Sequence, residues 1–308
     1  PGREPVKIYG VVGQVRARHE GARFDSDVWL IEDGVLPAEV SEAAQVQATR
    51  FEPEVFVPPL PGQEVRRASG AERDQVYRAM QLADRLSVNL EGPNPARLGA
   101  LAPKKQFVDE LLTPLRWIEA IRRERPAAEG WRGRWPSSTT QFVVGAVGES
   151  DLELLSATHH LIRAAGLKRA YFSAFHPIAD TPLSDRPAEN PWRQHRLYQA
   201  SYLFRDYGFD LEEMPFDDDG RLPLDTDPKR AWAGTNLRDA PVEVNRAERE
   251  ELLRVPGVGP KGAEAILAAR RRARLRSVGD LRQIGVRTKD IEPFVLLDGQ
   301  RPVYQLKL

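Results

Sequence analysis

The sequence predicts an α/β body followed by an all-helical tail. Between residues 55 and 175, segments rich in β-branched and aromatic residues alternate with segments of helical period, which favours parallel βαβ units. From residue 245 onward the pattern reads as helices throughout. The charges divide in the same way: residues 241–308 hold 14 Lys and Arg against 9 Asp and Glu, and residues 1–240 hold 31 against 36. A basic tail on an acidic body indicates a polyanionic partner for the tail.

Each element of the body follows from local composition. Strands are expected where β-branched and aromatic residues gather, at residues 6–12, 28–31, 55–57, 85–90, 139–144 and 169–175. Helices are expected where apolar residues recur every three or four positions, at residues 72–82, 105–123, 151–165 and 192–207. The second of these is interrupted near Pro114, and Gly166 closes the third. The predicted domains are an N-terminal β segment over residues 1–50, the body over 51–240 and the tail over 241–308.

Composition excludes several classes of protein. The chain contains no cysteine, which rules out disulfides, zinc–thiolate sites and an iron–sulfur cluster held by this chain alone. The five histidines are scattered, and we expect no metal site. No apolar run approaches the roughly 18 residues that a membrane helix needs, and no secretory signal opens the sequence. We therefore expect a cytoplasmic protein without a membrane partner.

The tail contains the most specific pattern in the chain. Residues 252–266 read LLRVPGVGPKGAEAI, an apolar helix that ends in a Pro-Gly-x-Gly turn before a second helix starts. The first helix is expected over 249–255, burying Leu252 and Leu253. The second is expected over 261–272, with Ala265 and Ile266 facing inward. A looser second unit follows, with a helix over 278–284, a Gly285-Val286 turn and another helix starting near Thr288.

Glycines in this turn allow a backbone conformation that a Cβ would resist. Successive amide N–H groups can then point outward at the N-terminus of the second helix and hold an anion. The pattern resembles the helix-hairpin-helix motif, whose usual anion is a nucleic-acid phosphate. The residues predicted to contact DNA are Pro256, Gly257, Val258, Gly259, Lys261, Gly262, Arg270, Arg271 and Arg274. The arginine run of the tail comprises Arg270, Arg271, Arg272, Arg274, Arg276, Arg282, Arg287 and Lys289. Two plainer interpretations stay open: the arginine run is a solvated helix face, or the turn is a helix connector used for protein contacts.

Several strings of the chain occur together in an order and spacing typical of one family. They are ADRLSVNLE at 83–91, LAPKK at 101–105, TTQFVVGA at 139–146 with Gly148-Glu149, YFSAF at 171–175 with Pro177, RLYQA at 196–200, DPK at 227–229 and NRA at 245–247. Taken together, these strings resemble the radical SAM proteins of DNA modification or repair that are encoded near uracil-DNA-glycosylase-like proteins. The resemblance runs from about residue 80 to 297, roughly two thirds of the chain, and it continues into the hairpin of the tail.

The resemblance implies a partial or degenerate (β/α) barrel of radical SAM type over residues 51–240, with the hairpin domain appended. In such barrels the ligand, here S-adenosylmethionine, sits at the carboxyl ends of the strands. The cofactor-binding residues that the resemblance implies are Asn89, Glu91, Gly145, Gly148, Glu149, Phe175 and Pro177. For Glu149, capping of the following helix is an equally good interpretation, and a glycine at a strand end commonly serves only as a turn.

The chain departs from this family in one decisive respect. The defining loop of the family carries three cysteines that bind a [4Fe–4S] cluster, and this sequence has none. The first hypothesis is therefore a protein of this family that binds duplex or damaged DNA and has lost cluster-based catalysis. Whether it is an enzyme stays open: the missing cysteines argue against catalysis by this chain alone, and no catalytic residue is identified. The second is an S-adenosylmethionine-binding subunit of a split enzyme, with the cluster supplied by a cysteine-bearing partner chain. The third is an assembly protein, with a uracil-DNA-glycosylase-like protein as its partner.

Overall fold

The computed structural model describes residues 14–15, 28–29, 72–289 and 291–302. The strands expected at 6–12 and 55–57 lie outside these residues. The chain divides into two compact units, Pro1–Glu149 with His160–Arg186, and Ser150–His159 with Pro187–Leu308. The predicted domain boundaries at residues 50 and 240 stay a prediction. No helix among the described residues is long and apolar enough to cross a membrane.

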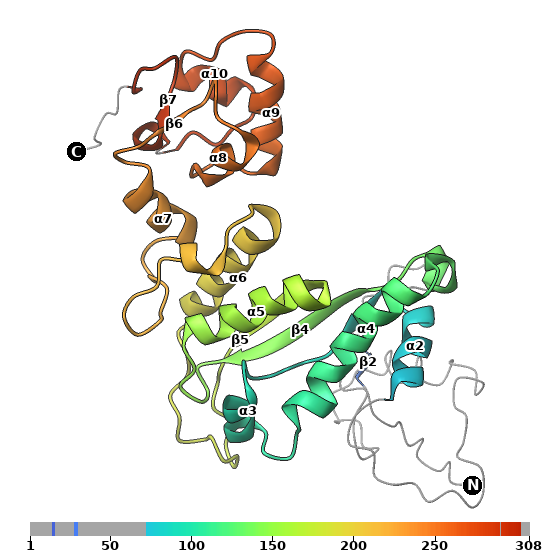
Figure 1. Cartoon of the computed structure of the whole chain (residues 1–308). Coiled ribbons are helices and arrows are strands. Elements are labelled where there is room, and N and C mark those ends of the chain that lie inside the picture. Colours follow the sequence, from blue (N-terminus) through green and yellow to red (C-terminus); the bar gives the residue numbers. More distant parts are fainter. Residues whose placement is uncertain (1–13, 16–27, 30–71, 290, 303–308) are drawn as a thin grey trace, which may run out of the picture. The chain divides into compact units, whose positions relative to one another are not determined.

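The first unit is built on a sheet whose strands run in the order β2-β1-β3-β4-β5 (Figure 1). Strands β3 (Arg85–Ser87), β4 (Ser137–Val144) and β5 (Leu167–Ala174) pair in parallel. Strand β1 (Gln14–Val15) pairs antiparallel with both β2 (Val28–Trp29) and β3. The parallel arrangement expected from strand–helix alternation is thus confirmed. The described sheet has three parallel strands, and closure into a barrel stays a prediction.

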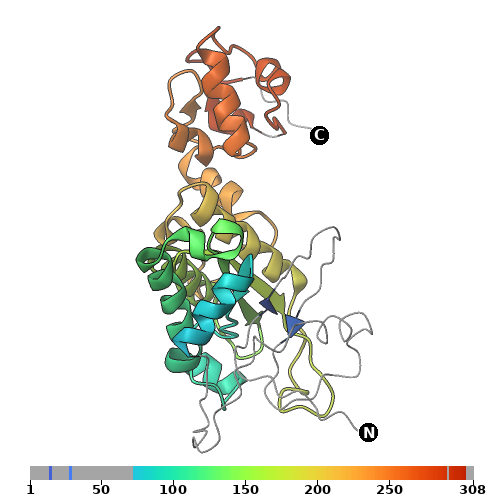
Figure 2. The same ribbon diagram turned by 90° about the vertical axis from the view of Figure 1, so that its right-hand side faces the viewer.

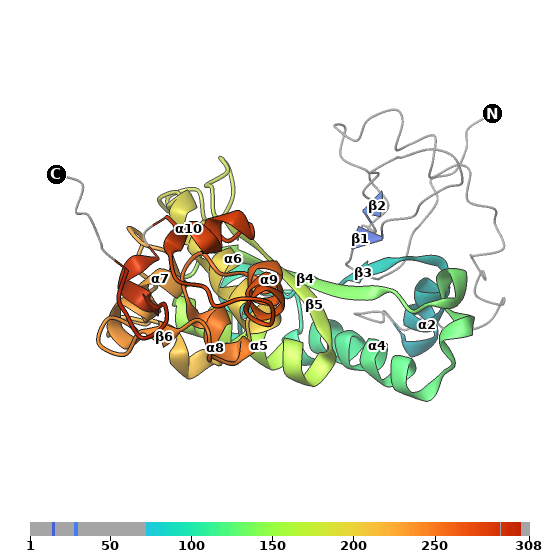
Figure 3. The ribbon, with the colours of Figure 1, turned by 90° about the horizontal axis from the view of Figure 1, so that it is seen from above.

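Helices α2 (Arg73–Leu82) and α4 (Thr113–Glu124) pack against each other beside this sheet (Figure 3). A π-helical turn over Phe107–Leu112 precedes α4, so the predicted interruption near Pro114 is confirmed. Proline lacks the amide that a helix interior needs, and here it occupies the first turn of α4, where that amide is not required. Phe142 and Phe172, from neighbouring strands, stack in the core with ring centroids 5.9 Å apart.

The sequence pattern did not predict two of the helices. Neither α3 (Pro95–Leu101) nor α7 (Pro228–Asn236) is among the helices expected from the sequence. Both begin with an N-cap side chain followed by proline at the first helical position. Asn94 Oδ1 accepts the amide of Arg97 at 3.0 Å, and Asp227 Oδ1 accepts that of Arg230 at the same distance. Such a pair starts a helix as readily as it makes a turn.

Helix α5 (Asp151–Ala165) has the predicted bounds and ends at Gly166, whose φ is +57°. The residues of α5 up to His159 belong to the second unit, and so does α6 (Pro191–Asp206). Within that unit the side chain of Asp151 is buried against Arg193 of α6, with an Oδ1–Nε distance of 2.6 Å. Residues 217–220 form a turn, closed by the Gly220 amide, which donates to the Asp217 carbonyl at 3.0 Å.

The hairpin part of the second unit contains α8 (Arg249–Arg254), α9 (Pro260–Arg270) and α10 (Val278–Gln283) (Figure 2). The expectation of an all-helical tail is wrong, because β6 (Val242–Glu243) and β7 (Val295–Leu296) pair in parallel. The helix expected near Thr288 is replaced by a single 3-10 turn at Glu292–Phe294. Pro293 cannot donate a helical hydrogen bond, and the apolar residues after it pair as a strand.

The residues that hold α8 against α9 are buried in the core of this region. Leu252 and Leu253 are buried, as predicted, and so is Ile266. The prediction for Ala265 is wrong: this residue is only partly buried, and Ala263 faces the core in its place. Residues three apart on a helix share one face, which is why Ala263 pairs with Ile266.

Candidate nucleic-acid interface

The turn between α8 and α9 depends on glycine at one position for two reasons. Gly257 has φ +85°, in the left-handed region that side chains resist. A methyl group added there would also overlap the backbone carbonyl oxygen of Arg287, closer than any real Cβ approaches. The turn is closed by the Val258 amide, which donates to the Val255 carbonyl at 3.1 Å. The tight hairpin predicted from the Pro-Gly-x-Gly pattern is therefore present.

Three amides at the start of α9 remain available to an anion. Gly259 is the N-cap and Pro260 the first helical residue, and the Ala263 amide donates back to the Gly259 carbonyl at 2.8 Å. The amides of Gly259, Lys261 and Gly262 find no acceptor among the residues that the structure describes. The first amides of a helix and its dipole attract negative charge. Gly257 and Lys261 are exposed, so solvent reaches this turn.

A buried lysine supports the turn from α7. Lys229 is 8% exposed, and its Nζ donates to the carbonyl of Val258 at 2.6 Å. The same ammonium lies over the ring of Tyr207, 4.6 Å from its centroid. Desolvation lowers the pKa of Lys229 to about 7, with Asp227 opposing the shift and Arg254 adding to it. One peptide carbonyl of the hairpin is thus fixed by a residue that precedes the motif.

Arg254, the last residue of α8, stabilises the second unit through contacts with aromatic rings and hydrogen bonds. Its guanidinium lies 3.7 Å from the ring centroid of Phe209 and 5.6 Å from that of Trp232. One terminal nitrogen donates to Glu213 at 2.9 Å and to the Gly208 carbonyl at 3.1 Å. These contacts join α8 to the segments around α6 and α7 within the second unit.

The predicted arginines do not gather at the turn. Arg270 lies nine residues beyond Lys261 on α9, which is about 14 Å along the helix axis, and its Nη1 donates to the carbonyls of Ala247 at 2.6 Å and Val244 at 3.2 Å. Arg274 is ion-paired with Asp298. Arg271 is exposed. The structure brings Pro256–Gly262 together at one end of α9 and places the three predicted arginines at the other.

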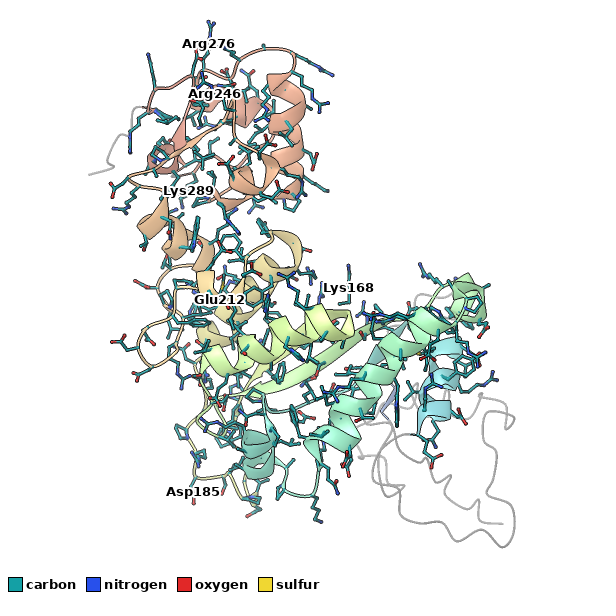
Figure 4. All side chains as sticks on the ribbon, in the orientation of Figure 1. Lys168, Asp185, Glu212, Arg246, Arg276 and Lys289 are labelled. Atoms are coloured by element: carbon teal, nitrogen blue, oxygen red, sulfur yellow. The ribbon has the colours of Figure 1, made fainter. Side chains whose placement is uncertain are left out.

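Another cation, Arg287, lies beside the turn. The backbone of Arg287 packs against Gly257, and its exposed side chain lowers the pKa of Tyr207, which burial and Asp206 raise overall. Lys289 is exposed as well, and Figure 4 shows it toward the α7 end of the hairpin region, with Arg276 at the opposite end. Both Arg287 and Lys289 belong to the arginine run of the sequence, but the sequence could not distinguish them from its other members, because only the fold brings residue 287 back to residue 257.

The residues assigned by resemblance to a cofactor lie in the first unit. Asn89 and Glu91 follow β3, Gly145, Gly148 and Glu149 follow β4, and Phe175 and Pro177 follow β5. Because these strands are parallel, all seven lie at the carboxyl edge of one sheet. Glu91 is held in this edge by its backbone, which exchanges bonds of 2.9 Å with Gln141 and Val143, and burial raises the pKa of its carboxyl despite Lys105 at 3.5 Å.

Glu149 is completely buried and its carboxylate serves its own loop. It accepts hydrogen bonds from the amides of Gly145 and Val147, the latter at 3.2 Å. Gly145 and Gly148 have φ of +91° and +76°, so this loop needs glycine at both positions. The first turn of α5 is capped by Ser150, whose Oγ accepts the amide of Glu153 at 3.1 Å. Beyond β5, Phe175 donates its amide to the Val144 carbonyl at 2.8 Å, and Pro177 is exposed.

Comparison with known proteins matches one part of the chain. The model of the helix-hairpin-helix motif matches residues 242–269, a segment that includes β6, α8, the glycine turn and nearly all of α9. No curated protein and no solved structure matches the chain. The geometry of the turn and this match agree: the second unit carries a helix-hairpin-helix motif, which suggests nucleic-acid binding.

Proposed function

We propose that this protein binds DNA by holding a backbone phosphate at the N-terminus of α9. The observation that carries the proposal is the set of three amides, on Gly259, Lys261 and Gly262, that have no acceptor among the described residues, in the segment that matches the helix-hairpin-helix model. The ammonium of Lys261 starts from the same turn and is exposed. Peptide amides and a cation at a helix N-terminus are the groups that bind phosphate without reading bases.

The binding is expected to depend on salt and little on sequence. Lys261, Arg287 and Lys289 are exposed cations of the hairpin region, and three phosphate contacts give a slope of log affinity against log salt of about −3. The net charge of +5 over residues 241–308 confines this attraction to the tail. Contacts of this kind fit duplex or damaged DNA.

The experiment measures fluorescence anisotropy of labelled duplex DNA across a range of salt concentrations. The wild type is expected to show the steep slope, and Lys261→Gln is expected to weaken binding and reduce the slope by about one. Lys168→Gln is the matched control, because Lys168 is an exposed lysine of β5, outside the hairpin (Figure 4). A wild type that binds DNA weakly and without salt dependence would refute the proposal and favour an assembly protein.

The body supports a second candidate, an S-adenosylmethionine-binding subunit of a split radical SAM enzyme of DNA modification or repair. What favours it is the convergence of three loops at one edge of a parallel sheet, where α/β proteins bind ligands. The donor set does not fit an iron–sulfur cluster, since the chain has no thiolate. The Glu149 carboxylate already accepts two amides of its own loop, so the fit to S-adenosylmethionine rests on the backbone of Gly145 and Gly148. Calorimetry with S-adenosylmethionine tests this candidate: no heat from the chain, alone or with a cysteine-bearing partner chain, would eliminate it.

A further inference from the structure

A tyrosine from outside the motif lies beside the turn between α8 and α9. Tyr207 directly follows α6, 35 positions before the matched segment begins at residue 242. A methyl group added at Gly259 would lie 3.2 Å from the Tyr207 hydroxyl. Because Gly259 is the N-cap of α9, this hydroxyl stands beside the amides proposed to hold a phosphate.

The phenol is held in place and keeps its proton. Lys229 lies over its ring, and that lysine is itself bonded to the Val258 carbonyl in the same turn. The Tyr207 hydroxyl has no hydrogen-bond partner among the described residues, and the side chain is only half-buried. Desolvation and Asp206 raise its pKa, opposed by Arg287, so at neutral pH the group is a neutral donor. A rigidly placed donor without a protein acceptor can serve a ligand at no cost in rearrangement.

We propose that the Tyr207 hydroxyl donates a hydrogen bond to the phosphate held by the amides of α9. This rests on the proposed function and deepens it, because it makes the phosphate site a product of two elements, the end of α6 and the hairpin. The contact is neutral, so it adds affinity without releasing a counterion. Salt dependence therefore separates the tyrosine from the surrounding cations.

The test is Tyr207→Phe, which removes only the hydroxyl and retains the ring against Lys229. DNA affinity is expected to fall about tenfold, the loss typical of one hydrogen bond to a charged group, while the salt slope and the thermal midpoint stay at the wild-type values. Arg287→Gln is expected to reduce the slope instead. The matched control is Tyr202→Phe, which removes the hydroxyl of an exposed tyrosine on α6 and is expected to leave affinity unchanged.

The location of the contact is tested with duplexes that carry a neutral methylphosphonate at one backbone position. At the contacted phosphate, this replacement is expected to weaken the wild type more than it weakens Tyr207→Phe. If the wild type binds with a steep salt slope and Tyr207→Phe binds equally well, the tyrosine contact is refuted and the proposed function stands. If Tyr207→Phe loses affinity together with its thermal midpoint, the hydroxyl is structural and the inference is overturned. A wild type without DNA affinity overturns both.

Discussion

Replacing Gly257 with alanine isolates the steric demand of the hairpin turn. The residue has φ +85°, and an added methyl group would overlap the carbonyl oxygen of Arg287. Left-handed backbone costs a non-glycine residue about 1–2 kcal/mol, and forcing an extra methyl into a packed region costs about 1–3 kcal/mol more. The free energy of opening is therefore expected to fall by roughly 2–5 kcal/mol.

Gly285→Ala provides the matched control for this substitution. Gly285 has φ +83°, nearly the same backbone conformation, and nothing lies within 4 Å of a methyl group added there. This variant carries the conformational cost alone, about 1–2 kcal/mol. Hydrogen–deuterium exchange over α8 and α9 measures the opening free energy of this region directly. Equal losses in the two variants would show that the Arg287 carbonyl does not restrict the turn, and the packing argument would be wrong.

Three further predictions concern residues around the hairpin. Gly262→Ala is expected to raise the free energy of unfolding by about 0.5–1 kcal/mol in urea denaturation, because an added methyl group meets Val258 and Val286 only at 3.6–3.7 Å. If the missing side chain at this position lets DNA approach the turn, the same variant will bind DNA more weakly in the anisotropy assay although it is more stable. Between about pH 7 and 10.5, Lys229 is protonated in the unfolded chain and deprotonated in the folded protein. The free energy of unfolding is therefore expected to rise with pH by up to about 1.4 kcal/mol per pH unit. Denaturation of Lys229→Met across the same pH range should lack this rise. Arg270→Ala leaves two carbonyls without their donor and is expected to lose about 1–3 kcal/mol on thermal denaturation, whereas an Arg271→Ala variant that is equally destabilised would contradict this assignment.

Elements with strong local signals were predictable from the sequence. Helix α5 combines an apolar period with a glycine at its end, and both of its bounds were correct. The glycine turn was equally visible, because a positive φ at Gly257 leaves few other residues possible. Helices α3 and α7 were missed because Asn-Pro and Asp-Pro also begin turns, so only the packing of the following residues distinguishes the two outcomes.

Features that depend on distant parts of the chain were not predictable. The pairing of β6 with β7 joins short segments some fifty residues apart, neither of which has a strand pattern of its own. Lysine is rarely buried, so nothing in the sequence indicated that Lys229 supports the hairpin. The arginine run was visible, but its division into Arg270, bonded to carbonyls, and Arg287, beside the turn, required the fold.

The contact between Lys229 and the Val258 carbonyl has a practical consequence for dissecting the molecule. A recombinant fragment starting at residue 241 would retain every residue of the motif and still discard this lysine, together with Tyr207 and Phe209. Its glycine turn would lose an anchoring partner, and Arg254 would lose the aromatic rings against which it stacks. The smallest excised piece that preserves this environment starts ahead of α6, so a truncation chosen from motif boundaries alone would report on an altered hairpin.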